Sequence, residues 1–268
     1  MTATYHSPRG ATSQLRPLSA GPDDRSLRPL LVFAAVALPV GWLLLSLYQI
    51  LDLPQELFVL GATFLGLVTP ALALTYRQRG RAGVYALLKD AVRPSRPLWW
   101  TPLAVLVLPV LVWGTASLFG GAQPLTASLL IEAGVLFVSA ALIINIWEEM
   151  AWTGFVQRRA MARWGLLIGS VVTGLLFAAI HLPLAFDGAS GAGDVGLGVA
   201  VLLGTGIGLR LLIARLDVWS GRSLLTIGLL HASFNTTAVF IDPAYDWIRL
   251  GVTILLGVLA VTVPSRRT

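Results

Sequence analysis

The sequence predicts an all-α, polytopic membrane protein with about eight transmembrane helices and a polar site inside the membrane. Of the 268 residues, 56% are hydrophobic and only 12% are charged, and the mean hydropathy is +0.79. A water-soluble domain carries about 25% charged residues, so this chain has too little polar surface for a water-exposed globule. The hydrophobic residues also gather in runs close to the roughly 20 residues that a membrane-spanning helix needs.

The first 28 residues differ from the rest. They are rich in Ser, Thr, Pro, Gly and Arg and show no apolar periodicity, so we expect residues 1–28 to be a disordered cytoplasmic tail. Residues 29–264 are expected to form one transmembrane domain. The first apolar run is too long for the core of a signal peptide and no small-residue cleavage site follows it, which predicts that it remains as the first helix.

The apolar runs define eight predicted spans. They lie near residues 29–50, 57–76, 98–119, 126–156, 166–189, 195–214, 223–241 and 246–264. Basic residues fall on every second connection, and Arg249 is the one exception among the 19 Lys and Arg residues. This alternation predicts eight spans with both termini in the cytoplasm, in a cell (inner) membrane. The sixth run has small residues spaced by four that predict a helix-packing face, Gly196, Ala200, Gly204 and Gly208.

Charge and cysteine content exclude several classes of protein. A net charge of +6 would suggest nucleic acid in a soluble protein, but here the basic residues lie between apolar runs. They therefore indicate topology and contact with anionic lipid, and we expect no nucleic-acid partner. The chain has no cysteine, which excludes disulfides, thiolate metal sites and a cysteine nucleophile.

A pair of carboxylates interrupts the fourth run. Glu148 and Glu149 lie inside Val135–Val156, and an acidic side chain at a helix centre costs about 2.5–3.5 kcal/mol. If the span ended at Trp147, the pair would instead be a solvated helix end. Because residues 150–156 are still mostly apolar, we expect the pair to lie within the membrane.

Two further polar groups occur at a similar expected depth. Phe177 and His181 lie in the second half of the fifth run, and Pro183 is expected to kink or end that helix beside His181. His231 and Asn235 lie in the seventh run, four residues apart, and so on one helical face.

Each of these residues also has an ordinary explanation. A histidine in a membrane helix is often a packing residue, the asparagine could join two helices, and the glutamates could pair with Arg210. Polar groups at one depth on three helices, however, stabilise one another only in a shared cavity. A carboxylate, two imidazoles and an amide in one cavity can activate water and stabilise an oxyanion.

Three segments resemble a known family. They are Glu148-Glu149-Met150-Ala151-Trp152-Thr153-Gly154, Phe177-x-x-x-His181 and His231-x-x-x-Asn235, and they are similar in order to the motifs of the CPBP (Abi) intramembrane peptidases. This family includes the type II CAAX prenyl endopeptidase, and the resemblance covers roughly residues 130–240. It implies an eight-helix membrane fold and hydrolysis of a peptide bond within or near the membrane.

The resemblance also implies roles for the site residues. Glu148 would be the general base and His181 would assist proton transfer. His231 and Asn235 would stabilise the oxyanion, and Glu149 would orient its neighbours. The implied partners are membrane lipid and a membrane-associated protein or peptide substrate.

No cofactor is firmly implied. The family is commonly labelled as metallopeptidases, although the same residues can act through glutamate-activated water without a metal. Two histidines and a carboxylate could bind zinc, but the chain has no H-E-x-x-H motif, so zinc is possible without being required.

One departure from the family pattern is expected to matter. The first motif usually has arginine directly before its glycine, and here that position is Thr153. We therefore expect Glu149 to lack a cationic partner, to be held loosely, and to leave the site poor at recognising C-terminal carboxylates. Two other functions stay open: a non-enzymatic relative that serves binding or immunity to a membrane-active peptide, and a proton-coupled transporter with a Glu–His relay. The lack of a visible internal repeat weighs against the transporter.

Overall fold

Residues 25–51 and 53–263 are described by the computed structural model. Within these ranges there is no β-strand, only one isolated bridge between Ala122 and Ile241. The prediction of an all-α fold is confirmed. The expected disordered tail lies almost entirely outside the described residues, so it stays a prediction; Arg28, its last residue, already belongs to the first helix.

The helices follow one another with short connections. In chain order they are α1 (Arg28–Leu51), α2 (Gln55–Gly61), α3 (Thr69–Val92), α4 (Trp100–Leu118), α5 (Ala127–Ser139), α6 (Ile146–Glu149), α7 (Arg158–Ile180), α8 (Ala192–Trp219), α9 (Leu224–Thr236) and α10 (Trp247–Thr262). Three π-helical segments join some of them into longer helices, Ala62–Val68, Ala140–Asn145 and Met150–Gln157. Three short 3-10 turns complete the fold, Leu182–Phe186, Thr237–Phe240 and Pro243–Tyr245.

Six helices in the described part of the chain are long and apolar enough to cross a membrane. They are Arg28–Leu51, Gln55–Val92, Trp100–Leu118, Ala127–Ile180, Ala192–Trp219 and Pro243–Thr262, and Leu224–Phe240 is a shorter apolar helix. The 54-residue helix contains the fourth predicted run from residue 127 and the fifth as far as Ile180. All eight predicted runs therefore lie on helices, and the chain is an integral membrane protein.

The 54-residue helix Ala127–Ile180 is divided by a glycine. Gly165 has φ 80° and ψ 172°, a conformation that glycine adopts without the steric cost of a Cβ. The fifth run was expected to extend to residue 189, and this boundary is wrong because α7 ends at Ile180. Pro183 lies in the 3-10 turn that follows, as expected for a residue that cannot donate a helical hydrogen bond.

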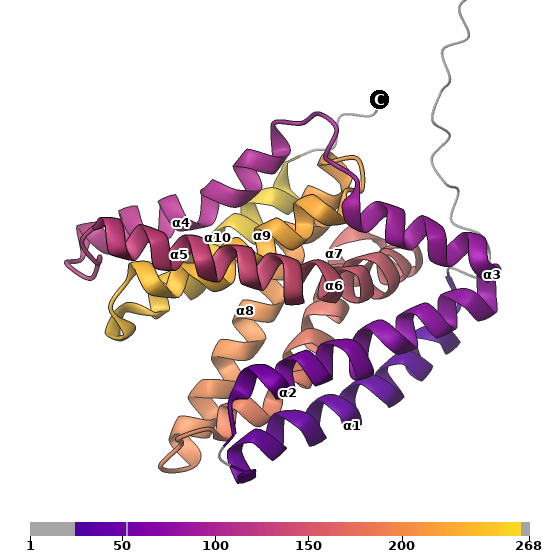
Figure 1. Cartoon of the computed structure of the whole chain (residues 1–268), viewed down its shortest axis with the longest axis horizontal. Helices are drawn as coiled ribbons and strands as arrows, with labels where there is room; N and C mark the ends of the chain where they lie inside the picture. Colours follow the sequence, from indigo (N-terminus) through magenta and orange to yellow (C-terminus); the bar gives the residue numbers. More distant parts are fainter. Residues whose placement is uncertain (1–24, 52, 264–268) are drawn as a thin grey trace, which may run out of the picture.

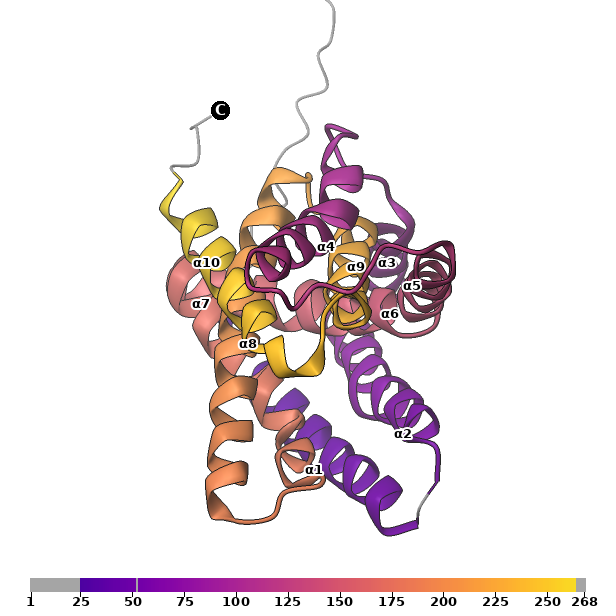
Figure 2. The same cartoon turned by 90° about the vertical axis from the view of Figure 1, so that its left-hand side faces the viewer.

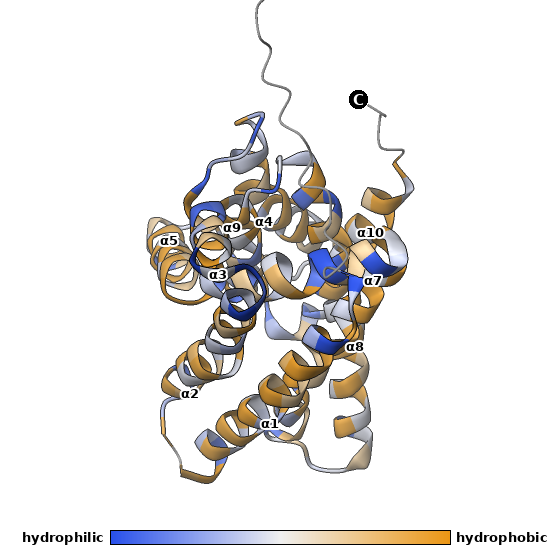
Figure 3. Ribbon diagram, turned by 90° about the vertical axis from the view of Figure 1, so that its right-hand side faces the viewer, coloured by the Kyte–Doolittle hydropathy of each residue, from blue (hydrophilic) through white to orange (hydrophobic). Residues whose placement is uncertain are grey.

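The helices are arranged in two groups. Figure 1 shows α4, α5, α9 and α10 together in the upper part of the molecule, with α1 and α2 side by side below them and α8 descending on the other side. The quarter-turn view in Figure 2 shows the same division. Apolar residues colour most of α1, α2 and α5 in Figure 3, whereas polar residues gather around α3 and α7. Many apolar side chains face outward, for example Ile50 at 75% and Leu118 at 84% exposure, as expected for a lipid-facing surface.

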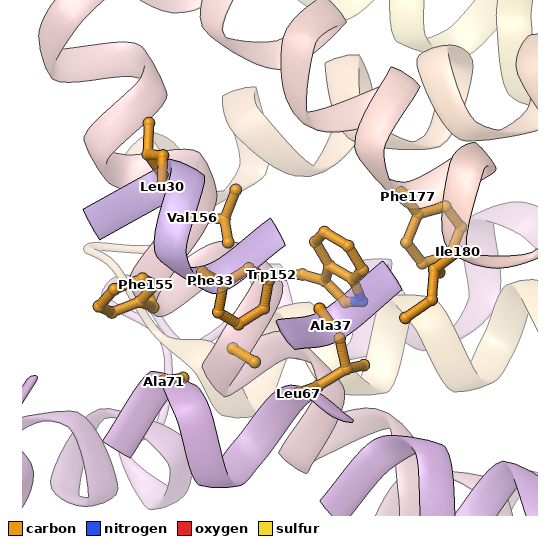
Figure 4. Packing of buried hydrophobic residues seen from close by; sticks show 11 residues of the cluster. Leu30, Phe33, Ala37, Leu67, Ala71, Trp152, Phe155, Val156, Phe177 and Ile180 are labelled. Carbon is orange, nitrogen blue, oxygen red and sulfur yellow. The ribbon is translucent and has the colours of Figure 1, made fainter. Parts of the chain in front are cut away.

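An aromatic cluster fixes the segment that follows the two glutamates. Trp152 packs edge-on against Phe33 of α1 and against Phe177 of α7, with ring centroids 5.8 and 5.6 Å apart. Phe155 lies against the same Phe33 ring, with centroids 5.5 Å apart, and Figure 4 shows these side chains converging. Buried aromatic pairs of this kind stabilise a fold beyond the area that they bury, so α1 holds this segment in place.

The predicted packing face of the sixth run is present in its second half. A Cβ added at Gly204 would lie 3.0 Å from Leu250, and one at Gly208 would lie 3.0 Å from Ile254, both on α10. At Gly196 a Cβ would meet nothing within 4 Å. Of the predicted face, Gly204 and Gly208 are therefore the glycines that close packing against α10 requires.

Candidate active site

Both glutamates of the fourth run are buried in the structure. They end α6, a single helical turn between the π-helical segments 140–145 and 150–157. Glu148 is 7% exposed and Glu149 is fully buried, so the alternative of a solvated helix end is wrong. π-helical turns within α-helices often occur at functional sites, and here they flank the carboxylate pair on both sides.

Four of the five predicted site residues line one cavity of about 220 Å³. Glu148 enters it from α6, His181 from the end of α7, and His231 and Asn235 from α9. The other lining residues are Val59, Ile144, Asn145, Phe177, Ala178, Leu202, Thr205 and Phe234. Glu149 does not line the cavity; it lies behind His231.

Glu148 has two polar neighbours. Thr63, in the π-helical segment 62–68, donates a hydrogen bond from Oγ1 to Glu148 Oε1 at 3.2 Å. The other carboxylate oxygen, Oε2, lies 3.9 Å from Nδ1 of His231. The carboxylate is therefore oriented by a hydroxyl from another helix while it still faces the cavity.

Glu149 forms a buried ion pair with Arg210 of α8. Nη2 donates to Oε1 at 2.7 Å and Nη1 donates to Oε2 at 2.8 Å, and both side chains are fully buried. Thr153 donates its hydroxyl to the same Oε2. Parallel bonds from a guanidinium to a carboxylate fix both distance and orientation.

The expectation that Glu149 lacks a cation and is held loosely is therefore wrong. The guanidinium comes from α8, 61 residues along the chain, rather than from within the motif. Its carbon lies 4.4 Å from the centre of the Phe177 ring, a cation–π contact that holds it in place. The expected poor recognition of C-terminal carboxylates loses its basis, because it rested on a missing charge.

Arg158, in contrast, takes no part in the cavity. Its guanidinium pairs with Asp90 of α3 and Asp217 of α8, both at 2.8 Å. It thus joins three helices at the side of the protein where the basic connections lie.

In each of the two histidines, one ring nitrogen donates a hydrogen bond to a defined acceptor. His231 donates from Nδ1 to Glu149 Oε1 at 2.7 Å, and His181 donates from Nδ1 to the carbonyl oxygen of Phe177 at 2.7 Å. Because a carbonyl and an ionised carboxylate only accept, the proton is on Nδ1 in both rings. Nε2 is then the nitrogen left for chemistry in the cavity. The Phe177 ring separates the imidazoles, with centroids 4.6 and 5.7 Å from theirs.

Two asparagine amides meet on the other side of the cavity. Asn235 donates from Nδ2 to Asn145 Oδ1 at 3.2 Å. Asn145 is fully buried, and its own Nδ2 has no hydrogen-bond partner within residues 25–51 and 53–263. A buried polar group without a partner costs about 1–3 kcal/mol, which makes this asparagine an unfavourable choice for packing alone.

A glycine allows α9 to approach the catalytic segment this closely. A Cβ at Gly228 would lie 2.7 Å from Cγ1 and 2.8 Å from Cα of Ile146, so no larger residue fits without a shift of one helix. His231 follows Gly228 by one turn and Asn235 by two, and their partners Glu149 and Asn145 flank Ile146. One close crossing therefore forms both contacts.

Zinc has no formed group of ligands in the described part of the chain. Among residues 25–51 and 53–263, no three His, Asp or Glu side chains are grouped as ligands of a metal ion. Glu149 is already bound to Arg210, and the Nδ1 contacts of the two histidines leave Nε2 of each ring free. Because no group of three ligands is formed, we derive no step through zinc.

Three residues of this site were not predicted from the sequence. Thr63 and Asn145 carried no recognised signal, although Asn145 lies three residues before Glu148 and thus on the same helical face. Arg210 was weighed only as an ordinary ion-pair partner for the glutamates. Its position inside the sixth apolar run, before Arg215 and Arg222, was a usable signal, since a buried guanidinium requires a carboxylate.

Fold and site together define a class of protein, a polytopic α-helical membrane protein with a glutamate, two histidines and an asparagine around one cavity. Residues 130–237 match the model of the family described as Type II CAAX prenyl endopeptidase Rce1-like. This match confirms the resemblance to the CPBP family and includes all five predicted site residues. The family is one of membrane proteases, which supports a peptidase at the level of the family. A comparison with the curated proteins gives no match.

Proposed function

We propose that this protein is an intramembrane endopeptidase that hydrolyses a peptide bond near the membrane through glutamate-activated water. The observation that carries the proposal is the common cavity of Glu148, His181, His231 and Asn235. The family match supports the same class of reaction. The non-enzymatic alternative was favoured by the missing motif arginine, and Arg210 supplies that charge from another helix.

Glu148 is the general base in this proposal. Its carboxylate takes a proton from a water molecule, and the resulting hydroxide attacks the carbonyl carbon of the substrate. Thr63 holds Oε1 through its hydroxyl, which leaves Oε2 facing the cavity. Nε2 of His181 accepts this proton from Glu148. It then delivers the proton to the amine nitrogen that leaves when the C–N bond breaks.

Asn235 and His231 stabilise the oxyanion. The Asn235 amide donates one N–H to Asn145 and keeps its second N–H for the developing negative charge. His231 donates from Nε2 when it is protonated. Donors that are already in place before the reaction stabilise the transition state without a cost of reorganisation.

Glu149 and Arg210 position His231. The ion pair fixes the carboxylate, the carboxylate accepts from Nδ1, and Nε2 is thereby turned toward the cavity. Arg210 thus acts through Glu149 and has no contact with the reacting atoms in this proposal.

The substrate is expected to reach the cavity along apolar walls. Val59, Ile144 and Leu202 line it on three different helices, and they suit an apolar peptide segment. The alternating basic connections predict that both termini of the protein lie in the cytoplasm.

The proposal is tested by comparing the termini of membrane proteins in three sets of cells. The first set has the native protein, the second lacks it, and the third has the Glu148→Gln variant at the same level. We expect new termini only in the first set. The same termini in cells with Glu148→Gln would contradict the role of Glu148, and identical termini in all three sets would contradict the peptidase function.

A further inference from the structure

We infer that Asn145 is a positioning residue for the oxyanion-binding amide, and that Asn145 and Asn235 act as one unit toward a peptide carbonyl. This inference rests on the proposed function and adds a residue to it. Asn145 lies outside the three motifs that carry the family resemblance.

The first support is the contact between the two amides. Asn235 is an exposed residue, and Oδ1 of Asn145 is the acceptor that holds its Nδ2, at 3.2 Å. With one N–H fixed in this way, the planar amide is held in one orientation. The direction of its second N–H then depends on Asn145.

The second support is the burial of Asn145. The residue is fully buried and lines the same cavity as Glu148, yet its Nδ2 has no partner among the described residues. Leucine has a similar volume and would fill this place without an unpaired donor. A buried polar group without a partner calls for an explanation, and among the described residues the side-chain hydrogen bond of Asn145 goes to Asn235.

The third support is the local backbone. Asn145 ends the π-helical segment 140–145, directly before the turn that carries both glutamates. The wider turn and the close crossing at Gly228 bring the amide and the carboxylates to the same side of α9. A change of packing at residue 145 would therefore act on Asn235 first and leave the Glu149–Arg210 pair unchanged.

The experiment uses purified full-length protein in lipid nanodiscs and a matched pair of probes. One is the apolar peptide aldehyde acetyl-Leu-Leu-leucinal, whose hydrate resembles the tetrahedral intermediate, and the other is the corresponding peptide alcohol, which has no terminal carbonyl. Native protein should bind the aldehyde at least tenfold more tightly than the alcohol. Asn145→Leu should remove most of that preference and leave alcohol binding unchanged.

Two further variants make the result specific. In the Asn235→Ala background, adding Asn145→Leu should change aldehyde binding by less than twofold, because the two residues act as a unit. Ser233→Ala is the matched control: its hydroxyl is also buried and unpartnered on α9, but it does not line the cavity, so both probes should bind as to native protein.

The outcomes separate the two proposals. An unchanged aldehyde preference in Asn145→Leu, or independent effects of Asn145→Leu and Asn235→Ala, would overturn the role of Asn145 while the peptidase proposal stands. If native protein showed no preference for the aldehyde, the proposed function would fail at the level of the site itself. Equal losses of the aldehyde preference in Asn145→Leu and Ser233→Ala would show that Asn145 acts only through packing, and would overturn its role as a positioning residue.

Discussion

Arg210 binds Glu149 from another helix through two parallel hydrogen bonds, Nη2 to Oε1 at 2.7 Å and Nη1 to Oε2 at 2.8 Å. Thr153 Oγ1 lies 3.4 Å from the same Nη1 and donates to the same carboxylate. Position 153 and position 210 therefore face one carboxylate from two sides. A cation at either position could bind it, and this chain has its cation on α8.

This geometry predicts that the cation that binds Glu149 can be moved from position 210 to position 153. Arg210→Met keeps an apolar side chain on the Phe177 ring but leaves Glu149 as an unpaired buried charge, which should destabilise the fold by about 3–5 kcal/mol. Peptidase activity should also fall, because His231 loses a fixed partner. Adding Thr153→Arg to the Arg210→Met variant should restore part of the stability and part of the activity. Thermal unfolding and peptide turnover in nanodiscs measure the two quantities.

The control for this pair is Arg163→Met, which removes an exposed arginine of α7 and should change neither quantity. Native stability and activity in Arg210→Met would show that the ion pair is dispensable. Failure of Thr153→Arg to recover any stability would show that position 153 does not reach the carboxylate.

Thr63 should affect turnover more than stability. Thr63→Val preserves the shape of the side chain and removes the hydrogen bond to Glu148 Oε1. One such bond is worth about 0.5–1.5 kcal/mol, so we expect kcat to fall by about threefold to tenfold with little change in KM. Steady-state kinetics with a cleaved peptide provide the measurement, and a change confined to KM would contradict a role in orienting the base.

Gly228 should be intolerant of any side chain. Gly228→Ala places a methyl group against the backbone of Ile146, and overpacking of this kind costs about 1–3 kcal/mol. The two helices must separate, so both the His231–Glu149 and the Asn235–Asn145 contacts should lengthen. Gly251→Ala is the matched control, since nothing lies within 4 Å of its Cβ position. Equal thermal stability of the two variants would argue against a close crossing.

The orientation in the membrane can be read from reporter fusions. Fusions after Arg93 and after Arg163 should report the cytoplasm, and fusions near Gln123 and Gly191 should report the opposite side, because basic connections stay inside. An external signal after Arg163 would mean that the helix Ala127–Ile180 crosses the membrane in the opposite direction. The ion pairs of Arg158 with Asp90 and Asp217 would then lie on the other side of the membrane.

Most of the fold could be predicted from the sequence, since every apolar run is a local feature and lies on a helix in the structure. His181 and the end of α7 were also predictable, because Pro183 acts on its own helix. The merging of the fourth and fifth runs into one helix with a bend at Gly165 was not, since Gly165 lies in the connection between the two predicted runs and a glycine there is equally typical of a loop between separate helices.

The pairing within the site was the part that sequence could not provide. Arg210 and His231 lie 61 and 82 residues after Glu149, and no periodicity relates side chains on different helices. The sequence identified Thr153 as a departure and offered Arg210 only as an ordinary ion-pair partner of the glutamates, because its role in place of a motif arginine depends on the crossing of α8 with the helix Ala127–Ile180. Asn145 was missed for a different reason: a single asparagine in an apolar run is also the usual means of joining two membrane helices.

The central claim is that Glu148 activates water for hydrolysis of a peptide bond. The most direct measurement is cleavage of a mixture of apolar peptides by purified protein in nanodiscs, followed by mass spectrometry, for native protein, Glu148→Gln and Glu132→Gln. Glu132 is an exposed glutamate of α5 outside the cavity, so its variant should cleave as native protein does. Glu148→Gln should lose at least 100-fold in turnover while it unfolds at the native temperature. Cleavage by Glu148→Gln at the native rate would contradict the account.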